Sequence, residues 1–107
     1  MIAPNDGELL EAVDAAVERC TDHAFAFLER LVAAPSTIGL EGRAQSIVAE
    51  ELGRLGFDVR TLEIPDDIVE DPVAGVPQAP YDGRHDVVGT MTADGNGPSL
   101  LVNGHID

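Results

Sequence analysis

Several residue types are absent or rare in this chain of 107 residues, which contains no lysine, no tryptophan and a single cysteine, Cys20. One cysteine excludes an internal disulfide framework. Its position on the apolar side of a predicted helix indicates a small buried hydrophobic residue rather than a nucleophile. Because the chain has only three phenylalanines and one tyrosine, the predicted core depends on leucine, valine, isoleucine and alanine.

Positive charge and long apolar runs are also scarce, and each scarcity excludes a class of partner. Twenty acidic residues stand against six arginines, which gives a net charge of −14. A field of this sign repels nucleic-acid phosphates and anionic lipids. No apolar run reaches membrane-spanning length, and residues 1–6 lack the features of a secretory signal. We therefore expect a cytoplasmic protein, whose acidity reflects either adaptation to high salt or an acidic part of a more balanced protein.

A long amphipathic helix is predicted over about residues 8–34. Asp6 is the expected N-cap, since its carboxylate can accept hydrogen bonds from free backbone N–H groups. Pro35 ends the helix because the residue before a proline is pushed out of the helical region. A break at Thr21 and Asp22 would divide the stretch into two helices. The apolar residues recur at spacings of three and four: Leu9, Val13, Ala16, Val17, Cys20, Ala24, Phe27, Leu28 and Leu31.

A second helix and a strand are predicted next. Apolar residues share one face of residues 41–55, and Gly56 suits the left-handed conformation that ends a helix. Residues 57–64 alternate apolar and polar side chains, which is typical of a half-buried strand. Residues 65–83 contain four prolines together with Asp-Asp and Asp-Gly pairs. This composition predicts an exposed connection, longer than most in a compact domain.

Two further strands are predicted at residues 85–92 and 99–103, joined by a glycine-rich turn at residues 93–98. The second of them has three successive apolar residues, which is typical of a central strand covered on both faces. Two helices followed by three strands form the opening of an α/β layered fold. Ligand sites in such folds lie beyond the carboxyl ends of strands. His105 and Asp107 are at that position.

His105 and Asp107 are the candidate site residues. Side chains two apart in an extended chain point to the same side. An imidazole binds zinc through one ring nitrogen, while a carboxylate near the other nitrogen fixes the orientation of the ring. Gly104 leaves room where the strand enters a crowded site. The pair alone is a weak signal in so acidic a chain, and the alternative is a histidine and an aspartate on a solvated loop.

Residues 100–107, Leu-Leu-Val-Asn-Gly-His-Ile-Asp, resemble the first metal-binding motif of the zinc-dependent deacylases and exopeptidases. That family includes acetylornithine deacetylase, succinyl-diaminopimelate desuccinylase and glutamate carboxypeptidase. One departure is Asp86, where family members commonly have asparagine, although this side chain is not a metal ligand. The resemblance covers nearly the whole chain outside residues 65–83, and upstream it is carried by Pro35-Ser36, Gly39, Glu41, Ala44, residues 55–59 and residues 83–89.

The resemblance implies that residues 1–107 are the N-terminal portion of a three-layer α/β/α zinc-peptidase-like catalytic domain. It implies that His105 binds one of two zinc ions, with cobalt or manganese as alternatives, and that Asp107 orients this ligand within the catalytic centre. The family's bridging aspartate, glutamate general base and remaining ligands lie downstream of the motif. His85 is expected to be structural or exposed, and four glutamates are expected to be surface or helix acids: Glu41, Glu50, Glu51 and Glu63.

The function implied by the resemblance is zinc-dependent hydrolysis of amide bonds in N-acyl amino acids or small peptides, by a full-length protein that forms a homodimer. One histidine cannot hold zinc tightly, because protein zinc sites use three or four ligands. We therefore expect the 107 residues to be a fragment of a longer hydrolase and to be inactive alone. Two alternatives stay open: a non-catalytic acidic α/β binding module, and an acidic α/β domain with an accidental likeness.

Overall fold

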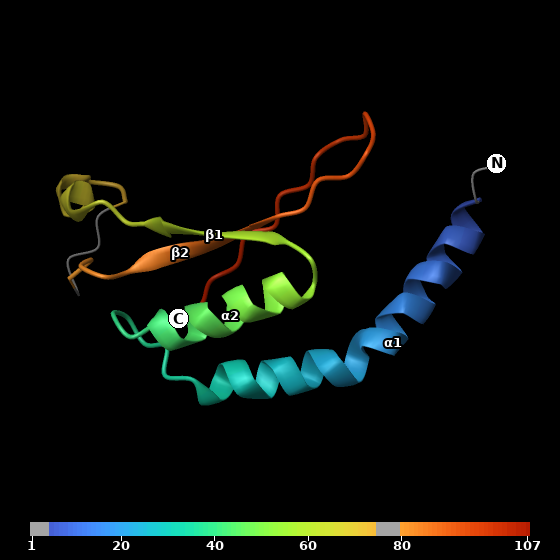
Figure 1. Ribbon diagram of the computed structural model, residues 1–107, viewed down its shortest axis with the longest axis horizontal. Helices are drawn as coiled ribbons and strands as arrows, with labels where there is room; N and C mark the ends of the chain where they lie inside the picture. Colours follow the sequence, from blue (N-terminus) through green and yellow to red (C-terminus); the bar gives the residue numbers. More distant parts are fainter. Residues whose placement is uncertain (1–4, 75–79) are drawn as a thin grey trace. The chain divides into compact units, whose positions relative to one another are not determined.

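The computed structural model describes residues 5–74 and 80–107. These residues form a small mixed α/β arrangement of two α-helices and a two-stranded antiparallel sheet (Figure 1). The chain divides into two units, the first built from α1 and the second comprising residues 34–107. Within the described part of the chain, no helix has the length and apolar character needed to cross a membrane. The elements in order are α1 (Asp6–Ala33), α2 (Gly42–Arg54), β1 (Asp58–Glu63), the 3-10 helix η1 (Asp66–Glu70) and β2 (His85–Thr90).

The first unit is the single helix α1, whose cap differs from the expected one. The Glu8 N–H donates to Asn5 Oδ1 over 3.0 Å, and the Asn5 N–H donates to the Glu8 carboxylate over 3.1 Å. Asn5 and Glu8 thus satisfy each other's backbone groups as a capping box, and the prediction of Asp6 as the cap is wrong. The predicted break is also absent, because α1 continues through Thr21, whose hydroxyl donates to the Val17 carbonyl.

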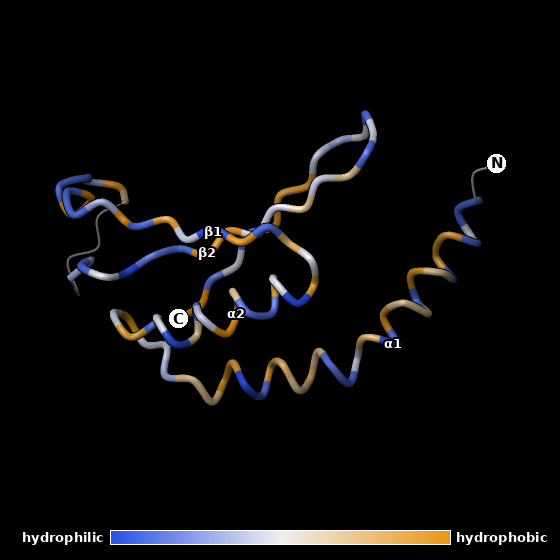
Figure 2. The backbone as a smooth tube through the Cα atoms, in the orientation of Figure 1, coloured by the Kyte–Doolittle hydropathy of each residue, from blue (hydrophilic) through white to orange (hydrophobic). Residues whose placement is uncertain are grey.

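Most apolar residues of α1 are exposed. Figure 2 shows hydrophobic and hydrophilic residues alternating along its turns, which confirms the amphipathic pattern. None of its residues is buried, and Cys20 is exposed, so the prediction of a buried Cys20 is wrong. The physical reason is that a lone helix has no second element in its own unit to cover its apolar face. The exposed large side chains are Leu9, Leu10, Val13, Val17, Phe25, Leu28 and Val32.

In the second unit, α2 packs against both strands of the sheet. It ends where the sequence predicted, since Gly56 adopts a left-handed φ of +89°. The Phe57 N–H donates a hydrogen bond to the Leu52 carbonyl over 3.0 Å. Two small residues permit α2 and the sheet to approach each other closely. They are Ala44 on α2, which is fully buried, and Gly89 on β2. A Cβ added to Gly89 would lie 3.1 Å from Leu52 and 3.2 Å from Phe57. The core is thin, because no large side chain of the described residues is fully buried.

The predicted strands at residues 57–64 and 85–92 are confirmed as β1 and β2. They pair antiparallel, with Asp58 opposite Thr90 at one end and Glu63 opposite His85 at the other. Side chains directly opposite each other in such a pair share one face of the sheet. The register therefore places the Glu63 carboxylate and the His85 imidazole side by side at the end where the long connection leaves the sheet.

The predicted third strand does not form. Residues 99–103 have no regular secondary structure, and Leu100, Leu101 and Val102 are 88%, 89% and 81% exposed. A strand is stabilised by a hydrogen-bonded neighbour, and among the described residues β1 and β2 pair with each other. The apolar run therefore has neither a ladder nor a packed face. The structure thus shows a mixed α/β arrangement with a two-stranded sheet, and it does not show three α/β/α layers.

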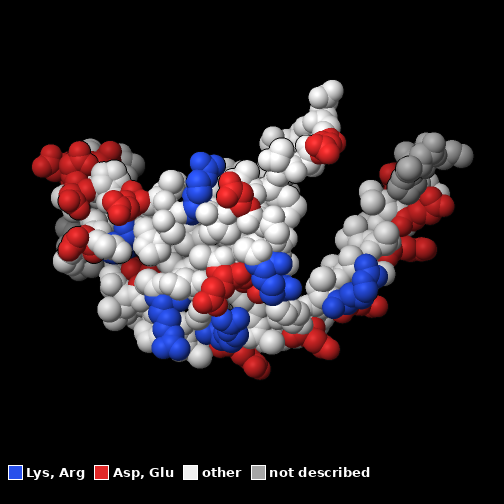
Figure 3. Space-filling model, viewed as in Figure 1, with Lys and Arg blue, Asp and Glu red and all other residues white. Residues whose placement is uncertain are grey.

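The connection at residues 65–83 is exposed over most of its described part, as predicted. It begins with η1, and the Asp71 carboxylate then accepts hydrogen bonds from the N–H groups of Val73 and Ala74. These bonds lower the pKa of Asp71. Residues 75–79 of the predicted connection lie outside the described residues. Figure 3 shows acidic side chains gathered at the end of the second unit that contains η1, whose first turn carries Asp66 and Asp67.

Candidate functional site

The two predicted site residues lie together near the end of the described chain. The Nδ1 atom of His105 is in ion-pair contact with Oδ1 of Asp107. The His105 side chain is 85% exposed, whereas that of Asp107 is 21% exposed. The expected proximity of imidazole and carboxylate is therefore present. The two residues do not follow a strand, however, because residues 99–107 have no regular secondary structure. The role of His105 as a metal ligand stays a prediction.

The described residues contain no group of three or more His, Cys, Asp or Glu side chains that could hold a metal ion. The remaining residues, 1–4 and 75–79, include none of these four types. His105 and Asp107 thus form a pair without a third ligand from the described chain. A zinc site requires three or four protein ligands, so the pair can contribute to such a site but cannot complete one.

A second charged pair, unlike the first, is enclosed by the fold. Arg84 donates from Nη2 to Glu41 Oε1 over 2.8 Å, and the two side chains are 19% and 10% exposed. The same carboxylate oxygen accepts the Gly39 N–H over 2.8 Å, and the Arg84 guanidinium lies 4.7 Å from the centre of the Tyr81 ring. Since Glu41 precedes α2 and Arg84 precedes β2, the pair connects the beginnings of these two elements.

The environment of Glu41 changes the pKa of its carboxyl group. Burial favours the neutral form and so raises the pKa, but the Gly39 N–H bond and the Arg84 charge favour the carboxylate. The net effect lowers the pKa of Glu41 from 4.5. Glu41 and Glu51 were predicted to be surface or helix acids; Glu51 does lie in α2 and Glu41 at its N-cap, but neither is at the surface, because both are buried. Glu51 accepts bonds of 2.7 and 3.0 Å from Arg54 one turn later.

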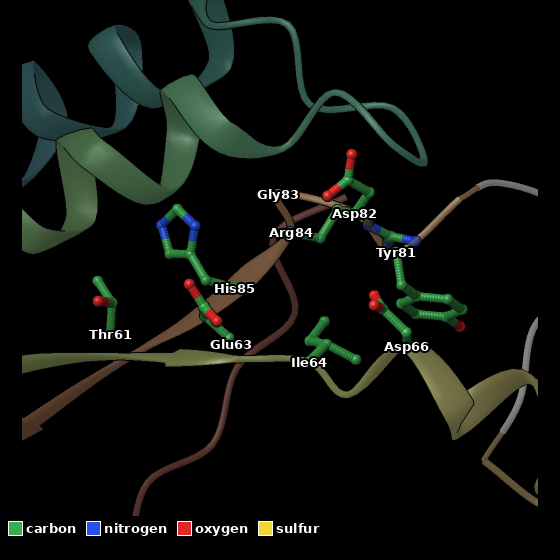
Figure 4. Close-up of a pocket in the computed structure, with 9 residues that line it drawn as sticks. All are labelled: Thr61, Glu63, Ile64, Asp66, Tyr81, Asp82, Gly83, Arg84 and His85. Carbon is green, nitrogen blue, oxygen red and sulfur yellow. The ribbon is translucent and has the colours of Figure 1, made fainter.

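An open pocket of about 290 Å³ lies beside the ends of the two strands (Figure 4). His85 and Glu63 occupy one side of it and lie next to each other in the close-up, as their register requires. His85 is half-buried, and the sequence did not predict this pocket. Strand register was the missing signal, because it alone brings residues 63 and 85 together. The lining residues are Thr61, Glu63, Ile64, Asp66, Tyr81, Asp82, Gly83, Arg84 and His85.

The site residues predicted from the sequence and the pocket are distinct, since neither His105 nor Asp107 lines the pocket. Comparison with protein-family models, with curated proteins and with solved structures found no match. The resemblance to zinc-dependent deacylases and exopeptidases is therefore an interpretation of the sequence motif. The contact between His105 and Asp107 is the structural observation that bears on it most directly.

Proposed function

We propose that this chain is part of a zinc-dependent hydrolase that cleaves amide bonds of N-acyl amino acids or small peptides, as a deacylase or carboxypeptidase. In this proposal His105 is a zinc ligand and Asp107 is the carboxylate that orients it. The observation that carries the proposal is the contact between His105 Nδ1 and Asp107 Oδ1. It supports the motif resemblance because metal-binding histidines are commonly held in this manner.

The two side chains fit one part of a zinc site. With a metal bound, Asp107 would accept the Nδ1 proton of a neutral imidazole, which would leave the Nε2 lone pair for the metal. The high exposure of His105 makes this nitrogen accessible to a metal. When bound, zinc acts as a Lewis acid that polarises an amide carbonyl and lowers the pKa of water. The described chain holds no group of three metal-ligating side chains, so in this proposal the further ligands come from other residues, and the resemblance implies the same for the general base.

Zinc titration of the 107-residue chain tests this ligand count. A single imidazole supported by one carboxylate does not hold zinc tightly. We expect calorimetry to show no tight, stoichiometric binding and an assay on N-acyl amino acids to show no hydrolysis. Tight binding of one zinc ion per chain would contradict the proposal that the site is incomplete within these residues.

A second experiment uses the protein translated from the complete reading frame that contains these residues. There, His105→Ala is expected to lower the zinc content and abolish hydrolysis, while Asp107→Asn lowers activity by about 10- to 100-fold by loosening the ligand. The matched control is His85→Ala, which removes an imidazole from the pocket and should leave zinc content unchanged. Equal zinc loss in the His85 and His105 variants would contradict the assignment.

The alternative function is a non-catalytic acidic binding module. The lack of a group of three metal-ligating side chains among the described residues is compatible with this module as well as with an incomplete zinc site. The same experiment separates the two functions. If the product of the complete reading frame binds no zinc and hydrolyses no amide, the binding module becomes the better interpretation.

A further inference from the structure

The turn that follows β2 contains an asparagine directly before a glycine. Residues 94–97 read Asp-Gly-Asn-Gly, and residues 91–98 are all exposed and belong to no helix or strand. Figure 1 shows this part of the chain extending away from the two-stranded sheet. Because glycine has no Cβ, its backbone nitrogen is open to attack on the side-chain carbonyl carbon of the preceding asparagine. The pair Asn96-Gly97 therefore brings an electrophile and a nucleophile together within the chain itself.

The local structure leaves both reacting groups unrestrained. No hydrogen bond joins the Asn96 side chain or the Gly97 N–H to another described residue. A Cβ built on Gly97 would meet no atom within 4 Å, so the space around the pair is open. An exposed loop without backbone ladders changes its dihedral angles at little cost. Rotation about the Asn96 backbone can thus bring the side-chain carbon to the Gly97 nitrogen.

Asn5 shows the opposite situation in the same chain. Its Oδ1 accepts the Glu8 N–H over 3.0 Å, and its own N–H donates to the Glu8 carboxylate. The capping box thus fixes the side chain of Asn5, and the next residue, Asp6, carries a side chain and begins α1. The fold restrains Asn5 and leaves Asn96 unrestrained.

We propose that Asn96-Gly97 is a site of spontaneous covalent modification, at which Asn96 is converted into isoaspartate and aspartate. The Gly97 nitrogen forms a bond to Cγ of Asn96, and the side-chain nitrogen leaves as ammonia, so that a five-membered succinimide remains. Water then opens this ring. Attack at Cγ restores the original main chain with an aspartate, whereas attack at the backbone carbonyl carbon routes the main chain through Cγ as isoaspartate.

The modification changes the turn and not the packed elements. It adds one negative charge two residues after Asp94, and the isoaspartate form lengthens the main chain by one methylene group. β2 ends at Thr90, so the paired strands lie outside the altered segment. The inference is independent of the proposed hydrolase function. It concerns Asn96 rather than Asn103, which also precedes a glycine but belongs to the motif of the candidate metal site.

Incubation of the 107-residue chain at neutral pH, followed by peptide mass spectrometry, tests the proposal. Fragment ions should assign to residue 96 the mass change that accompanies replacement of an amide NH2 by OH, and Asn5 should stay unmodified. The modified peptide should also accept methyl groups from an isoaspartyl methyltransferase, which is used here as a probe. Gly97→Ala should slow the reaction at Asn96 several-fold, because the added Cβ hinders ring closure.

The matched control is Gly95→Ala in the same turn, where an added Cβ likewise meets no atom within 4 Å. This variant should react at Asn96 as fast as the unmodified chain, and circular dichroism should show both variants folded. A second measurement isolates the effect of the structure. Since the fold does not restrain Asn96, its rate should be similar in the folded chain and in urea.

Three results would overturn the proposal. The first is an Asn96 that reacts in urea but stays intact in the folded chain, which would show that the turn protects it. The second is an equal slowing by Gly95→Ala and Gly97→Ala, and the third is a modified residue 96 that contains no isoaspartate.

Discussion

The second unit contains two charged pairs that differ in how they are made. Glu41 and Arg84 are 43 residues apart in the chain and are mostly buried. His105 and Asp107 are two residues apart, and the imidazole is 85% exposed. The first pair exists only because α2 packs on the sheet, whereas the second is a consequence of neighbouring positions in the chain. The comparison teaches that one pair is enclosed by the packing of distant segments, whereas the imidazole of the other pair is open to solvent.

The largest expected difference between the two pairs is in the free energy of unfolding that is lost when the carboxylate of each pair is removed. Glu41→Ala leaves the mostly buried Arg84 without its counter-charge, which should lower the free energy of unfolding by about 3 kcal/mol. Asp107→Ala removes an exposed interaction and should change it by less than about 0.5 kcal/mol. Urea denaturation followed by circular dichroism measures both. Equal losses in the two variants would remove the distinction between the pairs.

The packing that brings Glu41 to Arg84 can be disturbed at a distance from either residue. Gly89→Ala adds a methyl group 3.1 Å from Leu52, which pushes α2 away from β2 and should cost about 1–2 kcal/mol. The matched control is Gly53→Ala on α2, where no atom lies within 4 Å of the added Cβ. That variant should be about 0.5–1 kcal/mol more stable, because alanine favours a helix over glycine. Thermal unfolding of both variants tests whether Gly89→Ala is the less stable one. If Gly89→Ala is as stable as the unmodified chain, the contact between α2 and β2 at Leu52 is not tight.

The smallest expected effect is the contribution of Glu41 to the pH dependence of the free energy of unfolding. Because the pKa of Glu41 is lowered in the folded chain, the unfolded chain takes up the proton first as pH falls. The stabilisation from this group is complete above the ordinary glutamate pKa, and it is lost as pH falls through the lower folded value. Glu41→Gln should flatten this part of the stability profile in urea titrations at a series of pH values. A Glu41→Gln profile identical to that of the unmodified chain would contradict the assignment.

Local patterns accounted for most of the secondary structure. The spacing of apolar residues correctly predicted α2, alternation predicted β1, and an apolar segment before a glycine-rich turn predicted β2. Gly56 marked the end of α2 because its left-handed φ is a property that the residue type itself favours. The cap of α1 was one residue away from the predicted position, since both Asn5 and Asp6 have suitable side chains and only their geometry separates them.

The wrong predictions have a common physical origin. A run of three apolar residues at 100–102 predicts a strand only if another strand lies beside it, and the sequence pattern carries no information about that neighbour. Burial of Glu41 depends in the same way on an arginine 43 residues later. The pocket containing Glu63 and His85 depends on the register of two strands. Each of these features is a relation between distant residues, so a local pattern cannot specify it.

The sequence by itself determined the helices, the two strands, the acidic charge and the adjacency of His105 and Asp107, because each depends on residues within a few positions of one another. The tertiary structure decided which carboxylates are enclosed, which strands pair and which apolar residues stay exposed. Those outcomes depend on desolvation and on backbone hydrogen bonds between segments far apart in the chain. That is why Glu41, with nothing unusual in its local sequence, is buried against Arg84, whereas Leu100-Leu101-Val102, the most core-like run in the sequence, lies in solvent.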